Sequence, residues 1–143
     1  MHAHRLPLRI LLAAGVALGA ACGGSTTTPT APTASATTTD TFNANVSQTG
    51  SVTHNFKVTN SGEVTVTLTS VSPLTTMALG VGIMTSDGTN CVKTLTQNDN
   101  ARANNTAALE GTAVAGNYCV RVYDSGNIPE STTVSYTITV LHP

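Results

Sequence analysis

The stretch that decides the fold is Val64-Thr65-Val66-Thr67-Leu68-Thr69. Its apolar residues and threonines alternate one by one, which places the apolar side chains on one face of an extended strand and the hydroxyls on the other. The same two-residue period recurs elsewhere, in the runs 42–46, 52–58, 77–83, 118–122 and 134–140. The pattern predicts strands that each have one face on a core and one in solvent.

Polar segments that contain glycine separate these runs and supply turns. They are 60–62, 86–88, 115–117 and 124–127. Because asparagine, aspartate and glycine favour tight turns, the spacing predicts roughly seven or eight short strands. We therefore expect a single antiparallel β-sandwich of the jelly-roll type. The stretch 98–108 has no clear period and is expected to be the longest loop, while 107–114 is an ambiguous, weak strand.

Composition supports an all-β domain and argues against nucleic-acid binding. Of the 143 residues, only 9% are charged and 3% aromatic, tryptophan is absent, and the formal net charge is −1. Strand-favouring β-branched residues are abundant, whereas common helix formers such as glutamate and lysine are scarce. No basic patch is present to neutralise a phosphate backbone, so we expect no nucleic-acid partner.

The N-terminal segment has the features of an export signal. Arg5 and Arg9 precede an uncharged run over 10–21, which is too short to cross a bilayer because a spanning helix needs about 20 apolar residues. The segment 1–21 is therefore predicted to be a signal peptide. The residues Leu18-Gly19-Ala20-Ala21-Cys22 resemble the lipobox of bacterial lipoproteins, with Gly19 where leucine is usual.

That resemblance implies that the Cys22 thiol carries a diacylglyceryl group, with the new N-terminal amine open to a further acyl chain such as palmitate. Two or more acyl chains hold a protein at the membrane almost permanently. Gly23 follows in place of the aspartate that favours inner-membrane retention, so we expect a lipid-anchored, cell-envelope location, at the outer membrane where the host has one. Ordinary signal cleavage, with Cys22 left as a free thiol, is the alternative.

A low-complexity segment follows the anchoring cysteine. Nine of the 17 residues over 25–41 are threonine, with prolines interspersed. Such a composition offers no apolar surface to offset the entropy of ordering the chain, so a disordered tether is predicted over 22–41. The folded domain is accordingly expected over 42–143.

The cysteine count predicts a disulfide. The chain has three cysteines, and lipidation of Cys22 leaves Cys91 and Cys119 as a pair in an oxidising compartment. Each of the two shares a strand face with a basic residue two positions on, Lys93 or Arg121. We therefore expect the disulfide on the solvent face, where it would brace a small core from outside.

A family resemblance comes from the end of the chain. Ala115-Gly116-Asn117-Tyr118-Cys119-Val120-Arg121-Val122, followed by Tyr136-Thr137-Ile138-Thr139-Val140, resembles the end of bacterial pre-peptidase C-terminal domains. In that family a Gly-x-Tyr turn enters a strand of alternating valines, and a Tyr-x-Ile-x-Val strand ends the domain. The resemblance covers about 42–141 and concerns core and turn residues. Members usually flank a secreted peptidase, which this chain lacks, and no family ligand set matches here.

Candidate catalytic and metal-binding residues are few. The expected mature chain has two histidines: His54, on the apolar side of a strand and favoured as structural, and His142, beside the C-terminus. The carboxylates are scattered without a paired spacing, so we expect no enzyme. Asp124, Asn127 and Glu130 offer oxygen ligands that calcium would accept, but the same residues are ordinary turn formers. Turn chemistry is the favoured interpretation, and no cofactor is expected.

The sequence therefore predicts a non-enzymatic lipoprotein that displays a β-sandwich as a stability or interaction module. The alternative is a carbohydrate- or protein-binding (adhesion) module that uses the loops near 98–108 and 124–130. In that case Tyr123, the only tyrosine predicted to face outward, would contact the ligand together with Asp124 and Asn127. A single exposed aromatic residue is a small platform for sugar stacking.

Overall fold

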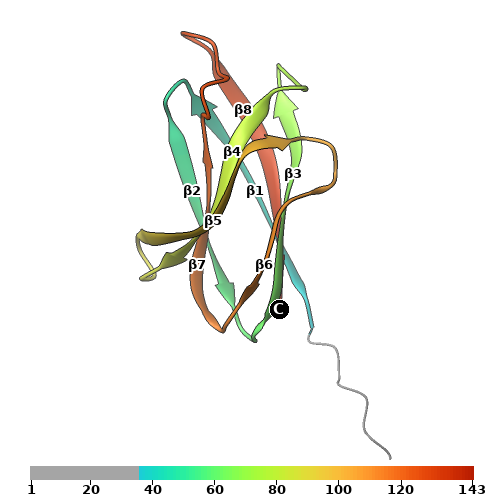
Figure 1. Ribbon diagram of the computed structural model, residues 1–143, viewed down its shortest axis with the longest axis vertical. Helices are drawn as coiled ribbons and strands as arrows, with labels where there is room; N and C mark the ends of the chain where they lie inside the picture. The colour runs from blue at the N-terminus through green and yellow to red at the C-terminus, as the bar shows by residue number, and fades with distance from the viewer. Residues whose placement is uncertain (1–35) are drawn as a thin grey trace, which may run out of the picture. The chain divides into compact units, whose positions relative to one another are not determined.

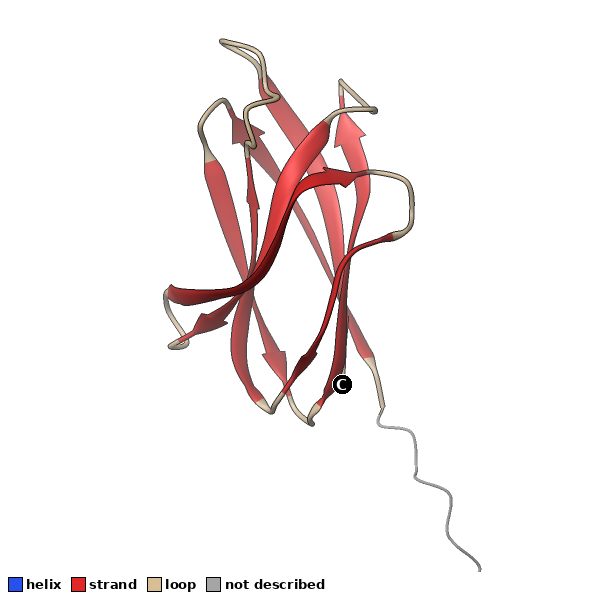
Figure 2. Cartoon of the chain, in the orientation of Figure 1, coloured by secondary structure: helices blue, strands red, loops and turns tan. Residues whose placement is uncertain are grey.

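The computed structural model describes residues 36–143, which form two antiparallel four-stranded sheets without a helix (Figure 1; Figure 2). The strands are β1 (Thr38–Ser47), β2 (Ser51–Val58), β3 (Gly62–Ser72), β4 (Ala78–Ser86), β5 (Cys91–Arg102), β6 (Ala107–Ala113), β7 (Gly116–Tyr123) and β8 (Thr133–His142). The expected signal peptide 1–21, Cys22 and most of the expected tether lie outside the described residues. Among the residues described, none forms a helix of the length and apolarity that a bilayer crossing requires.

The strand order is that of a jelly roll. Sheet A has the order β1-β8-β3-β6 and sheet B the order β2-β7-β4-β5. The first strand thus pairs with the last, the second with the seventh, the third with the sixth and the fourth with the fifth. This is the arrangement produced when a chain is folded in half at the β4–β5 turn and rolled up. The predicted all-β sandwich is confirmed.

The core lies between the two sheets and is built from the residues with the two-residue period. Val64, Val66 and Leu68 of β3 are each at most 1% exposed. Val120 and Val122 of β7, on the opposite sheet, belong to the same buried cluster and are fully inaccessible. Tyr118 and Tyr136 also face inward, as their spacing predicts. The alternation in the sequence therefore identifies the inner face of each sheet.

The domain begins earlier than expected. β1 starts at Thr38, four positions before the expected boundary at residue 42. The reason is backbone pairing: Thr38 and Thr41 lie opposite His142 and Thr139 of β8. Threonine is β-branched and suits an extended strand once a partner strand is present. Composition alone does not reveal that partner, because it comes from the other end of the chain.

The expected long loop over 98–108 is also wrong. β5 continues to Arg102 and β6 begins at Ala107, which leaves only 103–106 between them. The ambiguous segment 107–114 is a strand over Ala107–Ala113. The β4–β5 pairing shifts register at three places, between Leu79 and Val81, between Ile83 and Met84, and between Thr85 and Ser86. Each irregularity interrupts the two-residue rhythm that the sequence prediction relied on.

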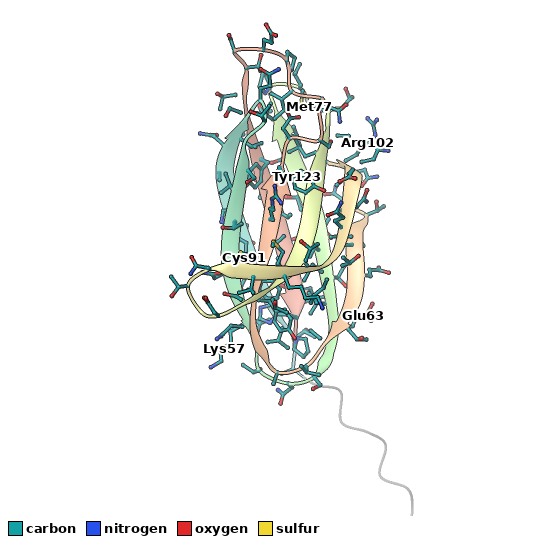
Figure 3. All side chains as sticks on the ribbon, turned by 60° about the vertical axis from the view of Figure 1, so that its left-hand side comes forward. Lys57, Glu63, Met77, Cys91, Arg102 and Tyr123 are labelled. Atoms are coloured by element: carbon teal, nitrogen blue, oxygen red, sulfur yellow. A yellow bond between two sulfur atoms is a disulfide. The ribbon has the colours of Figure 1, made fainter. Side chains whose placement is uncertain are left out.

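The disulfide between Cys91 and Cys119 is present, with the two Cα atoms 6.0 Å apart. Because β4 lies between β5 and β7 in sheet B, the bond joins strands that are not neighbours. The first residues of β5 cross the outer face of the sheet to reach Cys119 (Figure 3). Cys119 is fully buried rather than solvent-facing, although it lies outside the core cluster. The overlying end of β5 explains this burial.

Candidate functional site

The two ends of the sandwich differ in the chain segments that lie there. Thr38, where the chain enters β1, lies opposite His142 near the C-terminus, and Ser47 at the far end of β1 lies opposite Thr133. We call the first end the entry pole and the second the loop pole. The β1–β2 turn, the β3–β4 loop and the β7–β8 loop all lie at the loop pole (Figure 1). The entry pole is therefore where the preceding chain joins the sandwich.

A cavity of about 300 Å³ opens at the loop pole. It is lined by Leu74, Thr76, Met77, Ala78, Arg102 and Asn127. Met77 and Arg102 lie at this end of the molecule in Figure 3. The two regions expected to form a ligand site, near 98–108 and 124–130, meet here through Arg102 and Asn127. The β3–β4 loop completes the cavity, and its sequence did not predict a place in a ligand site.

Two of the polar side chains in this cavity are held by backbone carbonyls. Arg102 Nη1 donates to the Thr76 carbonyl over 2.5 Å. The Asn127 amide nitrogen donates to the Ala78 carbonyl at 3.2 Å and to Ser125 Oγ at 3.0 Å. Both donor hydrogens of that amide are used, and within residues 36–143 its oxygen accepts no hydrogen bond, so the oxygen remains an acceptor. The side chains are thus partly ordered before any partner arrives.

Arg102 is the charged group of this cavity. In the part of the chain that the structure describes, no carboxylate lies within salt-bridge distance of the Arg102 guanidinium. Leu74 beside it is 40% exposed and offers apolar surface. The cavity therefore combines a cation, an amide acceptor and an apolar wall, the mixture of convergent polar and apolar groups typical of binding sites.

Asp124 organises the loop pole. Its Oδ1 accepts backbone hydrogen bonds from Gly126, Asn127 and Ile128, and its Oδ2 accepts one from Thr49. Although partial burial works in the opposite direction, these four donors hold the pKa of Asp124 below its usual value. Within residues 36–143, no group of three or more histidine, cysteine, aspartate or glutamate side chains is placed to hold a metal ion.

Tyr123 lies on the outer face of sheet B, as its spacing predicts, but it is engaged by the protein itself. Its ring covers Gly80, its hydroxyl donates to Asp99, and the Arg121 guanidinium stands 4.7 Å from the ring centre. Burial, together with the hydrogen bond and charge of Asp99, raises the pKa of Tyr123 to about 12. Of the three expected ligand-loop residues, Asn127 alone lines the cavity at the loop pole.

The two histidines of the described domain occupy separate places. His54 points inward, stacks on Phe42 with ring centres 4.7 Å apart, and has its Nε2 2.8 Å from the Tyr136 hydroxyl. Burial lowers the pKa of His54. His142 pairs with Asp40 at the entry pole over 3.1 Å. Sequence analysis missed this pair, because Asp40 fell in the expected tether.

Comparison with known proteins adds no relative from which a role can be transferred. No protein-family model matches the chain, and no curated protein matches it either.

Proposed function

We propose that this chain is a non-enzymatic lipoprotein of the cell envelope that displays its β-sandwich as an interaction module and contacts its partner at the loop pole. The observation that carries this proposal is the position of the cavity. The chain enters the sandwich at Thr38, whereas Arg102 and Asn127 lie at the opposite end. An anchor at Cys22 would therefore attach to the sandwich at the end opposite the cavity.

The contacts of the histidines support a non-enzymatic role. A hydrolase would need a histidine beside a nucleophile at an open site. Here His54 bonds to the core residue Tyr136, and His142 is 4% exposed beside Asp40. The order at the loop pole supports binding instead, because Asp124 joins the β1–β2 turn to the β7–β8 loop and Asn127 is fixed by Ala78.

The anchoring part is tested by extracting the full chain from the envelope and analysing its N-terminus by mass spectrometry. The expected product begins at Cys22 and carries a diacylglyceryl group, and a Cys22→Ser variant is expected to leave the membrane fraction. An unmodified N-terminus elsewhere, or membrane retention of Cys22→Ser, would overturn the lipoprotein assignment.

The binding part is tested by screening the mature chain on glycan and extracellular-protein arrays. Binding is expected to be lost when Arg102→Ala and Asn127→Ala are combined. Lys93→Ala is the matched control, because Lys93 is an exposed cation on the same strand, β5, and does not line the cavity. A ligand that binds the double variant as tightly as wild type would show that the loop-pole cavity is not the site.

A further inference from the structure

A second hollow lies on the outer face of sheet A, away from the loop-pole cavity. It has a volume of about 380 Å³ and spans three strands, with Asn43 and Asn45 from β1, Ser135 and Thr137 from β8, and Ser70 from β3 among its lining residues. We call it the sheet A groove. All five side chains are uncharged and polar, and each carries a hydroxyl or an amide.

The groove belongs to an ordered array of hydroxyls and amides. Three successive rows cross β1, β8 and β3: Thr41–Thr139–Thr67, Asn43–Thr137–Ser70 and Asn45–Ser135–Ser72. Neighbouring strands are about 4.8 Å apart, and alternate residues along a strand about 6.7 Å. All nine positions are neutral and polar, so these three rows of the outer face carry no charge.

An irregularity in β3 places Ser70 in this array. The β3–β8 pairing shifts between Leu68 and Ser70, so that Ser70 lies opposite Thr137 and Val71 opposite Tyr136. Val71 consequently stays in the core at 2% exposure, while Ser70 faces outward. The extra residue, Thr69, donates from its hydroxyl to the Thr137 carbonyl at 3.1 Å. Bulges of this kind re-aim side chains and often lie beside functional sites.

The groove retains free hydrogen-bonding capacity. Thr137 Oγ1 donates to Asn43 Oδ1 over 2.6 Å, which orients the Asn43 amide and leaves its two N–H donors toward solvent. Among the described residues, the Asn45 side chain makes no hydrogen bond, so both its donor and its acceptor are open. Ser135 Oγ bonds to the Ser72 carbonyl at 3.3 Å. The surface therefore offers donors and acceptors side by side.

We propose that the sheet A groove binds a strand of neutral polysaccharide. Every sugar hydroxyl is both a donor and an acceptor, which complements the mixed lining around Asn43 and Asn45. A charged ligand would lose hydration without gaining a counter-charge there. Stacking on aromatic rings plays no part, so each site is expected to bind weakly. Many copies on one membrane would compensate through avidity.

This inference goes beyond the function proposed for the loop pole, and its test separates the two. The mature chain is titrated by NMR with cellohexaose, maltohexaose, mannohexaose and xylohexaose, and with hexagalacturonate as the charged counterpart. Saturable binding to at least one neutral hexaose is expected, with shifts centred on Asn43, Asn45 and Thr137. Arg102→Ala is expected to bind that hexaose as wild type does.

Ser135→Leu fills the groove with apolar bulk and is expected to weaken binding at least about tenfold, equivalent to about 1.4 kcal/mol. Thr133→Leu is the matched control, since Thr133 is exposed on the same strand but outside the groove. Asn43→Ala combined with Asn45→Ala provides a second test that adds no bulk. The proposal is overturned if no neutral hexaose saturates the protein, if hexagalacturonate binds more tightly, or if the groove variants bind as wild type does.

Discussion

The ring of Tyr123 lies over the Cα of Gly80, in the space that a Cβ at position 80 would occupy. The two residues face each other across the β4–β7 pairing, and Gly80 is buried. Asp99 and Arg121 hold the ring in place through its hydroxyl and its face. The absent side chain at Gly80 thus leaves the space that an aromatic ring from the neighbouring strand fills.

Gly80→Ala is expected to destabilise the domain by about 1–3 kcal/mol, because the added methyl group forces the Tyr123 ring to move. Urea denaturation measures the change. Gly111→Ala is the matched control: a Cβ at Gly111 of β6 would meet no atom within 4 Å. In a Tyr123→Ala background, Gly80→Ala should cost much less. Equal costs in both backgrounds would mean that the ring is not the obstacle.

Asp124→Ala is expected to destabilise the domain, because four backbone N–H groups lose their shared acceptor. A single hydrogen bond contributes about 1 kcal/mol, so the midpoint of urea unfolding should fall clearly. The lowered pKa of Asp124 fixes the sign of the pH effect. Its stabilisation is present above the ordinary carboxyl value of 3.8 and is lost as the pH falls below it.

The same geometry predicts indifference to calcium, because the Asp124 oxygens already accept backbone protons. Adding about 5 mM CaCl₂, above the roughly 1 mM dissociation constants of weak extracellular sites, should leave the melting temperature unchanged. A rise that EDTA reverses and that Asp124→Ala abolishes would refute this prediction and establish a calcium site. Asp87→Ala serves as the control, since Asp87 fixes a separate turn at Thr89 and Asn90.

His54 is expected to make stability depend on pH near neutrality. Burial lowers its pKa from the ordinary value of 6.5, so the unfolded chain binds a proton more readily than the folded one. Stability is therefore fully present above pH 6.5 and declines as the pH falls through that value toward the lower folded pKa. Urea midpoints between pH 7.5 and 5 measure the effect, and His54→Gln should flatten the profile. An unaltered slope in that variant would assign the dependence to another group.

The sequence predicts most of the fold because local alternation and turn residues carry it. The inward faces of β3 and β7 follow directly from runs such as Val64, Val66 and Leu68. The pairing of strands that are far apart in the sequence cannot be predicted from such local patterns. β1 extends back to Thr38 because β8 lies beside it, and Asp40 meets His142, 102 positions further along the chain. Only the start of β5, at Cys91 and Lys93, was expected as a strand, and three register shifts interrupt the pairing of β5 with β4.

The loop-pole cavity is only partly predictable for a related reason. Asn127 stood out as a turn residue, and Arg102 lay within a segment expected to be a loop. Leu74 gave no local signal and Met77 was expected at the start of a strand, since both join the cavity only through the path of the β3–β4 connection. Asp124 has the residue type of a calcium ligand, and the difference between a ligand and a turn former lies in which backbone N–H groups reach it.

Loss of the Cys91–Cys119 disulfide is expected to lower the melting temperature of the domain markedly. The cysteines are 28 positions apart, and closing a loop of that length contributes about 3–4 kcal/mol in the chain-entropy model. The Cys91→Ala, Cys119→Ala double variant should therefore melt well below wild type, and reducing agent should lower the melting temperature of wild type but not of the double variant. Cys22→Ser is the control, because Cys22 is not needed for this bond, and its melting temperature should respond to reductant as wild type does. If reductant left wild type unchanged, the disulfide would not brace the sandwich, and the crossing of β5 over β7 would have to be held by packing alone.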